Sequence, residues 1–167
     1  GTYLGGLAGT YRQMKRYDEA IALTLQSLLI IKNKLGENHY DHIETEFNLA
    51  ETYREAGKFE EAKKHYLNSM KGYLLLIEKY FPYLGESEKT HFYNNVSYAF
   101  ELFNSFVIEQ QSAFPAKDHT ALTERMYDNQ VAIKSLLLKE SEAWRNQIAA
   151  SGNDELKKEY QQWLRMR

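Results

Sequence analysis

Apolar residues recur every three or four positions along most of this chain, which is the spacing of an amphipathic helix. One such stripe consists of Tyr17, Ile21, Leu25, Leu28 and Ile31. No segment alternates apolar and polar residues as a half-buried strand would, and only two prolines interrupt the 167 residues. The pattern therefore predicts an all-α protein.

Breaks in this periodicity divide the chain into helices. Residues 1–84 should hold two helical hairpins, with helix pairs at about 2–34 and 41–81. Residues 85–167 should hold a three-helix extension, with long helices at about 87–114 and 120–151 and a last one at 153–167. Pro115 and Gly152 are expected to end the first two helices of the extension.

The two hairpins carry the same residue types at a constant offset of 42 positions. The offset relates five residues of the second hairpin to five of the first, namely Leu49, Ala50, Tyr53, Phe59 and Ala62 to Leu7, Ala8, Tyr11, Tyr17 and Ala20. It also relates the turn residue Gly57 to Lys15. This pattern resembles the tetratricopeptide repeat (TPR). The resemblance implies a TPR helical-hairpin solenoid of two repeats followed by a long-helix extension, because one hairpin cannot bury its apolar face alone.

The linker between the hairpins, residues 35–41, reads Leu-Gly-Glu-Asn-His-Tyr-Asp. It resembles the joint of the 42-residue repeats in kinesin-light-chain-like TPR proteins, with Tyr40 in place of the usual proline. Asp41 and Glu44 have the spacing of a capping box, so we expect them to start the second hairpin.

The extension contains the stretches Lys134-Ser135-Leu136-Leu137-Leu138 and Ser151-Gly152-Asn153-Asp154-Glu155-Leu156. With the rest of residues 84–167 they resemble the helical region that precedes the CHAT domain in bacterial TPR–CHAT proteins. CHAT domains have a caspase-like cysteine-peptidase fold. The resemblance implies that this chain is the regulatory arm of a larger bacterial protein, with a CHAT domain in cis after Arg167. The His and Cys of that family lie in the CHAT domain itself, so no catalytic residue carries over.

Composition removes several classes of function. The formal charge is −2, and residues 1–84 carry 11 basic and 11 acidic side chains while residues 85–167 carry 10 and 12. This balance gives no basic patch for phosphates, so nucleic acid is not an expected partner. The absence of cysteine excludes disulfides and a cysteine nucleophile, and it favours a reducing, cytoplasmic setting. No apolar run reaches the ~20 residues that span a membrane.

Catalytic and metal chemistry also find little support. His39 and His42, with Glu44 nearby, lack a third metal ligand at a suitable spacing, so structural or solvent-facing roles are expected for them. The remaining histidines, His65, His91 and His119, stand alone without a nucleophile to serve. Glycines 5, 6 and 9 lie within a helical pattern and not after a strand, so they do not form a phosphate-binding loop. We therefore predict no catalytic, metal or cofactor site.

The TPR resemblance implies that the first helix of each repeat lines a concave face that binds a protein or peptide. In this chain the candidate binding residues are Arg12, Gln13, Phe47, Asn48, Glu51, Arg54 and Glu55. TPRs that grip the carboxylate of chaperone tails use a Lys/Asn/Arg clamp. Three matching positions here hold Gly5, Gly9 and Asn48, and because two of the three lack the required side chain, chaperone-tail binding is not expected.

Two hypotheses remain. The first is a non-catalytic protein-interaction scaffold that serves as the recognition arm of a TPR–CHAT protein. The second is a stand-alone TPR adaptor or self-assembling repeat protein, in which the open repeat edge at Gly1 would allow homo-oligomers. A hydrolase in its own right is disfavoured because no nucleophile–base pair is evident.

Overall fold

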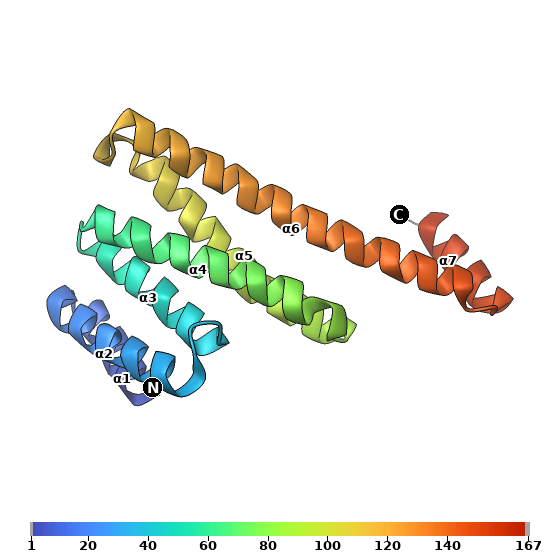
Figure 1. Ribbon diagram of the computed structural model, residues 1–167, viewed down its shortest axis with the longest axis horizontal. Helices are drawn as coiled ribbons and strands as arrows, with labels where there is room; N and C mark the ends of the chain where they lie inside the picture. The colour runs from blue at the N-terminus through green and yellow to red at the C-terminus, as the bar shows by residue number, and fades with distance from the viewer. Residues whose placement is uncertain (1, 166–167) are drawn as a thin grey trace. The chain divides into compact units, whose positions relative to one another are not determined.

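A computed structural model describes residues 2–165 (Figure 1). Its helices, in chain order, are α1 (Thr2–Gln13), α2 (Tyr17–Leu35), α3 (Tyr40–Glu55), α4 (Phe59–Tyr80), α5 (Glu86–Glu109), α6 (Ala116–Ala150) and α7 (Asp154–Arg165). Two short 3₁₀ turns, η1 (Phe81–Tyr83) and η2 (Gln111–Ala113), flank α5. No strand occurs between residues 2 and 165, so the prediction of an all-α fold is confirmed.

The first four helices form two hairpins, α1–α2 and α3–α4, with α2 packed on α3 between them. Gly57 makes the turn of the second hairpin with φ +73°, a left-handed conformation that glycine adopts without steric cost. Lys15 takes the corresponding place in the first hairpin and has φ 59°. The offset of 42 residues therefore preserves the turn geometry even though the first repeat has no glycine there.

The second hairpin begins at a different cap from the one expected. His39 is the N-cap of α3, and its Nδ1 accepts a hydrogen bond of 3.1 Å from the backbone N–H of Asp41. Asp41 and Glu44 instead lie inside the helix, so the predicted capping box is wrong. An imidazole nitrogen can satisfy an unpaired N–H of the first turn as a carboxylate would.

Small residues bring α3 and α4 together, as the repeat pattern predicts. Ala50 and Ala62 are 0% exposed, and so is Leu49. Gly72 of α4 faces Ile43 of α3 so closely that a Cβ at Gly72 would lie 2.5 Å from Ile43 Cγ1. The hairpin therefore has small, fully covered residues along its length and a close approach of its helices at Gly72.

Aromatic side chains of α4 and α5 pack together, so the hydrophobic core of the second hairpin extends to α5. Tyr66 of α4 is 0% exposed and its ring lies 5.8 Å from Phe103 and 4.8 Å from Phe106. Tyr73 contacts Phe100 one turn earlier on α5, at 6.5 Å between ring centroids. Thus α5 packs on the second hairpin as a further repeat helix would, although the motif does not recur at the 42-residue offset.

α5 ends earlier in the chain, and α6 begins earlier, than expected. α5 ends at Glu109 and η2 follows, whereas a helix continuing to about residue 114 was expected. α6 starts at Ala116, directly after Pro115, whose carbonyl accepts the N–H of His119 at 3.0 Å. The fixed φ of proline suits the start of a helix, so Pro115 opens α6 as well as closing the preceding turn.

The chain divides into two compact units, residues 1–130 and residues 131–167. The first holds the hairpins, α5 and the beginning of α6; the second is the hairpin formed by the end of α6 and α7. The division at residue 84 that the repeat pattern suggests stays a prediction about where the repeats end. Within residues 2–165, no helix combines the length and the apolar character required to cross a bilayer.

Candidate protein-binding face

Ion pairs join the first helices of successive hairpins near their carboxyl ends. Arg12 Nε of α1 lies 3.8 Å from Glu55 Oε1 of α3, and Arg54 Nη1 of α3 lies 3.6 Å from Glu109 Oε2 of α5. We call the surface that these four side chains share, with the neighbouring exposed residues of α1 and α3, the A-helix face. Its pairs are partly solvated, so each contributes at most about 1 kcal/mol to stability.

Four of the predicted binding residues are accessible on α1 and α3 in this region. Gln13 and Asn48 are exposed, and the side chains of Arg12 and Glu55 are 32% and 35% exposed. Asn48 and Glu55 are seven residues apart on α3 and therefore lie on the same side of that helix. The surface offers both charge signs and an amide that donates and accepts hydrogen bonds, which are the groups that recognise a peptide backbone.

The predicted residue Glu51 lies beneath this surface and is 6% exposed. Its carboxylate accepts a hydrogen bond from the Tyr66 hydroxyl and another, at 2.9 Å, from Arg54 Nη2. Burial raises the pKa of the Glu51 carboxyl, and Arg54 opposes that shift. Arg54 itself is 24% exposed, so it connects the buried carboxylate to the open surface.

Phe47 also lies in the core and not on the open surface. It is 7% exposed, and its ring packs edge-on against Tyr66 at 6.0 Å and Tyr73 at 6.4 Å. Phe47 and Glu51 therefore support the A-helix face from below, while a ligand would meet Arg12, Asn48 and their exposed neighbours.

The glycines of α1 leave the first helix bare. A Cβ added at Gly5, Gly6 or Gly9 would have no atom within 4 Å. At Gly5 and Gly9 this chain therefore lacks two side chains of the carboxylate clamp found in chaperone-binding TPRs, although larger side chains would fit there. This part of α1 offers open space and no specific group for a ligand.

A hollow that the sequence did not predict lies between the beginning of α3 and the beginning of α5. It has a volume of about 550 Å³ and is lined by Tyr40, Leu84, Ser87, Glu88, His91, Phe92 and Asn95. Adding 42 to Leu49, Ala50 and Tyr53 gives His91, Phe92 and Asn95, so the offset does reach this site. The change of residue type at these positions concealed that they line a surface between repeat helices.

Two of the histidines, His39 and His65, make structural contacts. His65 was expected to stand alone, but it has two neighbours. Its Nδ1 lies 2.7 Å from Glu46 Oε2, and its ring stacks on Tyr53 at a centroid distance of 5.4 Å. His39 caps α3 and His42 is 7% exposed. Among the residues that the structure describes, no group of three His, Asp or Glu side chains is arranged to hold a metal ion.

Comparison with known proteins agrees with the geometry of the hairpins. No curated protein matches the chain. Residues 1–74, which span α1 to α3 and most of α4, match the family model of the tetratricopeptide repeat. This part of the chain therefore resembles a TPR array in both sequence and helical-hairpin geometry, and TPR repeats generally bind proteins or peptides.

Proposed function

We propose that this chain is a non-catalytic scaffold that binds a protein or peptide segment on the A-helix face. The observation that carries this proposal is the row of ion-paired and amide side chains across α1, α3 and α5, set on a core of buried aromatic residues. A rigid surface with exposed hydrogen-bonding groups loses little conformational freedom on binding, which favours recognition of an extended segment.

Peptide selection on the immobilised chain tests this proposal. Peptides from a display library would be selected on the wild-type protein and their affinities measured by fluorescence anisotropy. The double variant Arg12→Ala, Asn48→Ala should weaken binding about tenfold, since each side chain offers charge or amide hydrogen bonds to the ligand. Equal affinity of this variant and the wild type would contradict binding on the A-helix face.

A matched control is available on α2. Asn33 and Lys34 are exposed there, and the double variant Asn33→Ala, Lys34→Ala removes one amide and one cation, as the test variant does. This control should leave the affinity of the selected peptides unchanged. A comparable loss in both variants would show that net charge, and not the A-helix face, governs the binding.

The finer proposal is that the scaffold is the regulatory arm of a bacterial, cytoplasmic TPR–CHAT protein. The kinesin-light-chain-like linker at residues 35–41 and the stretches at 134–138 and 151–156 support it, together with the absence of cysteine. The test is the natural reading frame that follows Arg167. A downstream domain with a His and a Cys would agree with the proposal, and a stop codon within a few residues would refute it.

The alternative is a stand-alone adaptor or self-assembling repeat protein. The exposed edge of α1 favours it: Leu7 is 46% exposed, whereas its counterpart Leu49 is covered completely. Tyr3 and Met14 extend the same helix edge and are 94% and 54% exposed. The expected contact point at Gly1 lies outside the described residues. Light scattering that showed a concentration-independent monomer would refute self-assembly through this edge.

A further inference from the structure

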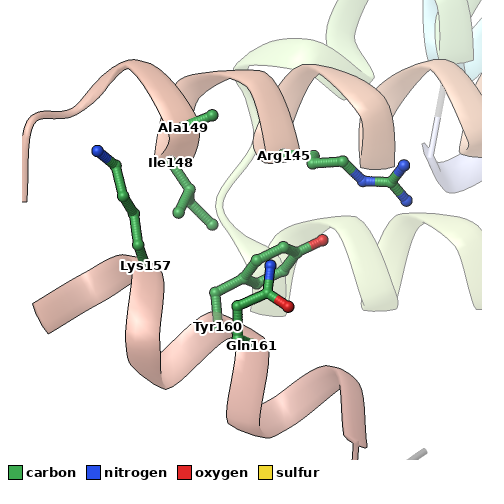
Figure 2. A pocket seen from close by; sticks show the side chains of 6 residues that line it. All are labelled: Arg145, Ile148, Ala149, Lys157, Tyr160 and Gln161. Atoms are coloured by element: carbon green, nitrogen blue, oxygen red, sulfur yellow. The ribbon is translucent and has the colours of Figure 1, made fainter. Parts of the chain in front are cut away.

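The hairpin formed by the end of α6 and α7 holds a second hollow, remote in sequence from the TPR array (Figure 2). It has a volume of about 360 Å³ and is lined by Arg145, Ile148, Ala149, Lys157, Tyr160 and Gln161. None of these residues takes part in the A-helix face. This hollow is therefore independent of the binding surface proposed above.

A well-defined turn sets the two helices against each other. Gly152 has φ +67°, and the Asn153 side-chain Oδ1 accepts the N–H groups of Glu155 and Leu156, both at 3.1 Å. Asn153 is thus a complete N-cap for α7. Because this turn fixes the direction of α7, the side chains of the two helices face each other in a defined register.

Figure 2 shows how the lining side chains are arranged. The Tyr160 ring lies opposite Ile148, Lys157 extends from α7 toward α6 on the turn side, and Arg145 extends along α6 away from the turn. The hollow therefore has an apolar centre with one cation toward each end. The small Ala149 side chain leaves the space between the helices unfilled.

The charges of the hollow are poorly compensated. Among the described residues that line it, none carries a carboxylate. Lys157 Nζ lies 3.6 Å from Asp154 Oδ1, but the Asp154 side chain is 96% exposed, so water screens this pair. Arg145 has no ion-pair partner within the described part of the chain. A ligand with negative charge toward both ends would complement this arrangement.

The apolar residues of α7 favour a helix as the ligand over a small anion. Leu156, Tyr160 and Trp163 are spaced by four and three residues and so lie along one side of α7. Leu156 is 39% exposed and Trp163, whose ring stacks on Tyr160 at 5.8 Å, is 44% exposed. A two-helix hairpin cannot cover such a stripe, and a third helix packed in its groove would do so.

We propose that this hollow docks an amphipathic helix of a partner protein in which acidic residues flank an apolar one. The apolar side chain would pack between Ile148 and Tyr160. The flanking carboxylates would pair with Arg145 at one end and with Lys157 at the other. The Gln161 amide would accept or donate a hydrogen bond at the rim of the same groove.

The test uses the full chain and a synthetic peptide of roughly 18 residues, long enough to form a helix. The peptide is built from Glu, Ala and Leu, with the Leu residues on one face and Glu on either side of them, and carries a fluorescent label. A second peptide has Gln in place of every Glu. Anisotropy titrations at low salt should show binding of the acidic peptide at least about tenfold tighter than binding of the Gln peptide.

Two double variants separate the hollow from general electrostatics. Arg145→Ala with Lys157→Ala should weaken binding of the acidic peptide about tenfold. Lys134→Ala with Lys158→Ala removes two exposed cations of the same unit that do not line the hollow, and should leave binding unchanged. Equal losses in the two variants, equal binding of the two peptides, or no binding of the acidic peptide would each overturn the proposal.

Discussion

Gly72 lies inside α4 at a point where this helix approaches α3 closely. A Cβ at this position would lie 2.5 Å from Ile43 Cγ1, 2.9 Å from Cδ1 and 3.0 Å from Cγ2. Ile43 is 3% exposed and branches at its Cβ, so its side chain cannot swing away as the end of a long flexible chain could. We therefore predict that Gly72→Ala destabilises the protein, although alanine is the better helix former.

The magnitude follows from two opposing effects. Replacing glycine by alanine within a helix stabilises it by about 1 kcal/mol. Forcing an extra methyl group into a packed interior costs typically about 1–3 kcal/mol. The net effect is a loss of roughly 0–2 kcal/mol with a central value near 1 kcal/mol, which lowers the melting temperature by about 2–4 °C in a chain of this size.

Gly6→Ala on α1 is the matched control, because a Cβ there would meet no atom within 4 Å. Gly6→Ala should gain the higher helix propensity of alanine without a steric clash, and so raise the free energy of unfolding by up to about 1 kcal/mol. All tyrosines except Tyr160 lie in residues 1–130, whereas both tryptophans lie in residues 131–167. Urea unfolding followed by the near-ultraviolet circular dichroism of tyrosine therefore reports on the unit that contains both substitutions.

A double-mutant cycle with Ile43→Ala identifies the cause. Ile43→Ala removes the three atoms that the new Cβ would meet, so Gly72→Ala should become neutral or stabilising in that background. The steric reasoning is refuted if Gly72→Ala stabilises the otherwise unchanged protein as much as Gly6→Ala does. It is also refuted if the cost of Gly72→Ala is the same with and without Ile43.

Three further predictions concern the buried polar network and the second unit. Tyr66→Phe removes the hydroxyl that donates to the buried Glu51 and should cost about 1–3 kcal/mol in urea unfolding; an unchanged midpoint would show that this hydrogen bond contributes nothing. Burial raises the pKa of the Glu51 carboxyl, so the folded state binds the proton of this carboxyl more tightly than the unfolded state does. The stability that this proton contributes is therefore largest below the usual carboxyl pKa and falls as the pH rises toward the raised pKa. The stability of Glu51→Gln relative to the wild type should therefore increase as the pH rises above the usual carboxyl pKa of about 4 in urea titrations, and a difference that does not change with pH would contradict this assignment. Asn153→Ala removes the cap of α7 and should cost about 0.5–2 kcal/mol when unfolding is followed by tryptophan fluorescence, while the tyrosine signal should keep its midpoint.

The two hairpins were predictable because their signals are local. Leu49, Ala50 and Ala62 occupy repeat positions whose burial follows from helical spacing alone, and all three are completely covered. The turn at Gly57 was predictable for the same reason, since a glycine between two periodic stretches marks a left-handed residue. Helix period and turn chemistry both act over a few residues, so the sequence displays them directly.

The features that sequence reasoning missed depend on distant partners. Glu51 and Phe47 were placed on the open face because their positions on the first helix of the repeat resemble binding positions. Their burial follows from Tyr66, which lies 15 residues further along from Glu51 and whose ring Phe47 contacts. His65 looked isolated because its partner Glu46 is 19 residues away on the preceding helix. Pairings of this kind follow from hairpin register and side-chain direction, which helical period alone does not determine.

The role of α5 was also concealed. Its packing residues Phe100, Phe103 and Phe106 do not occupy the repeat positions, because η1 and a longer helix change the register after Tyr80. The apolar periodicity predicted a long helix at about residues 87–114, and the structure shows that the aromatic side of this helix meets α4. Sequence reasoning thus found the helix and its apolar side but not the surface that it completes with α3.

The most direct test of the A-helix face as the binding surface is amide hydrogen exchange of the full chain, with and without a peptide selected on it. Bound peptide is expected to slow amide exchange in α1 and α3, around Arg12 and Asn48, and to leave the exchange of the outer helices α2 and α4 unchanged. Protection confined to α2 and α4, or equal exchange in the free and bound protein at the A-helix face, would contradict the assignment of this face as the binding surface.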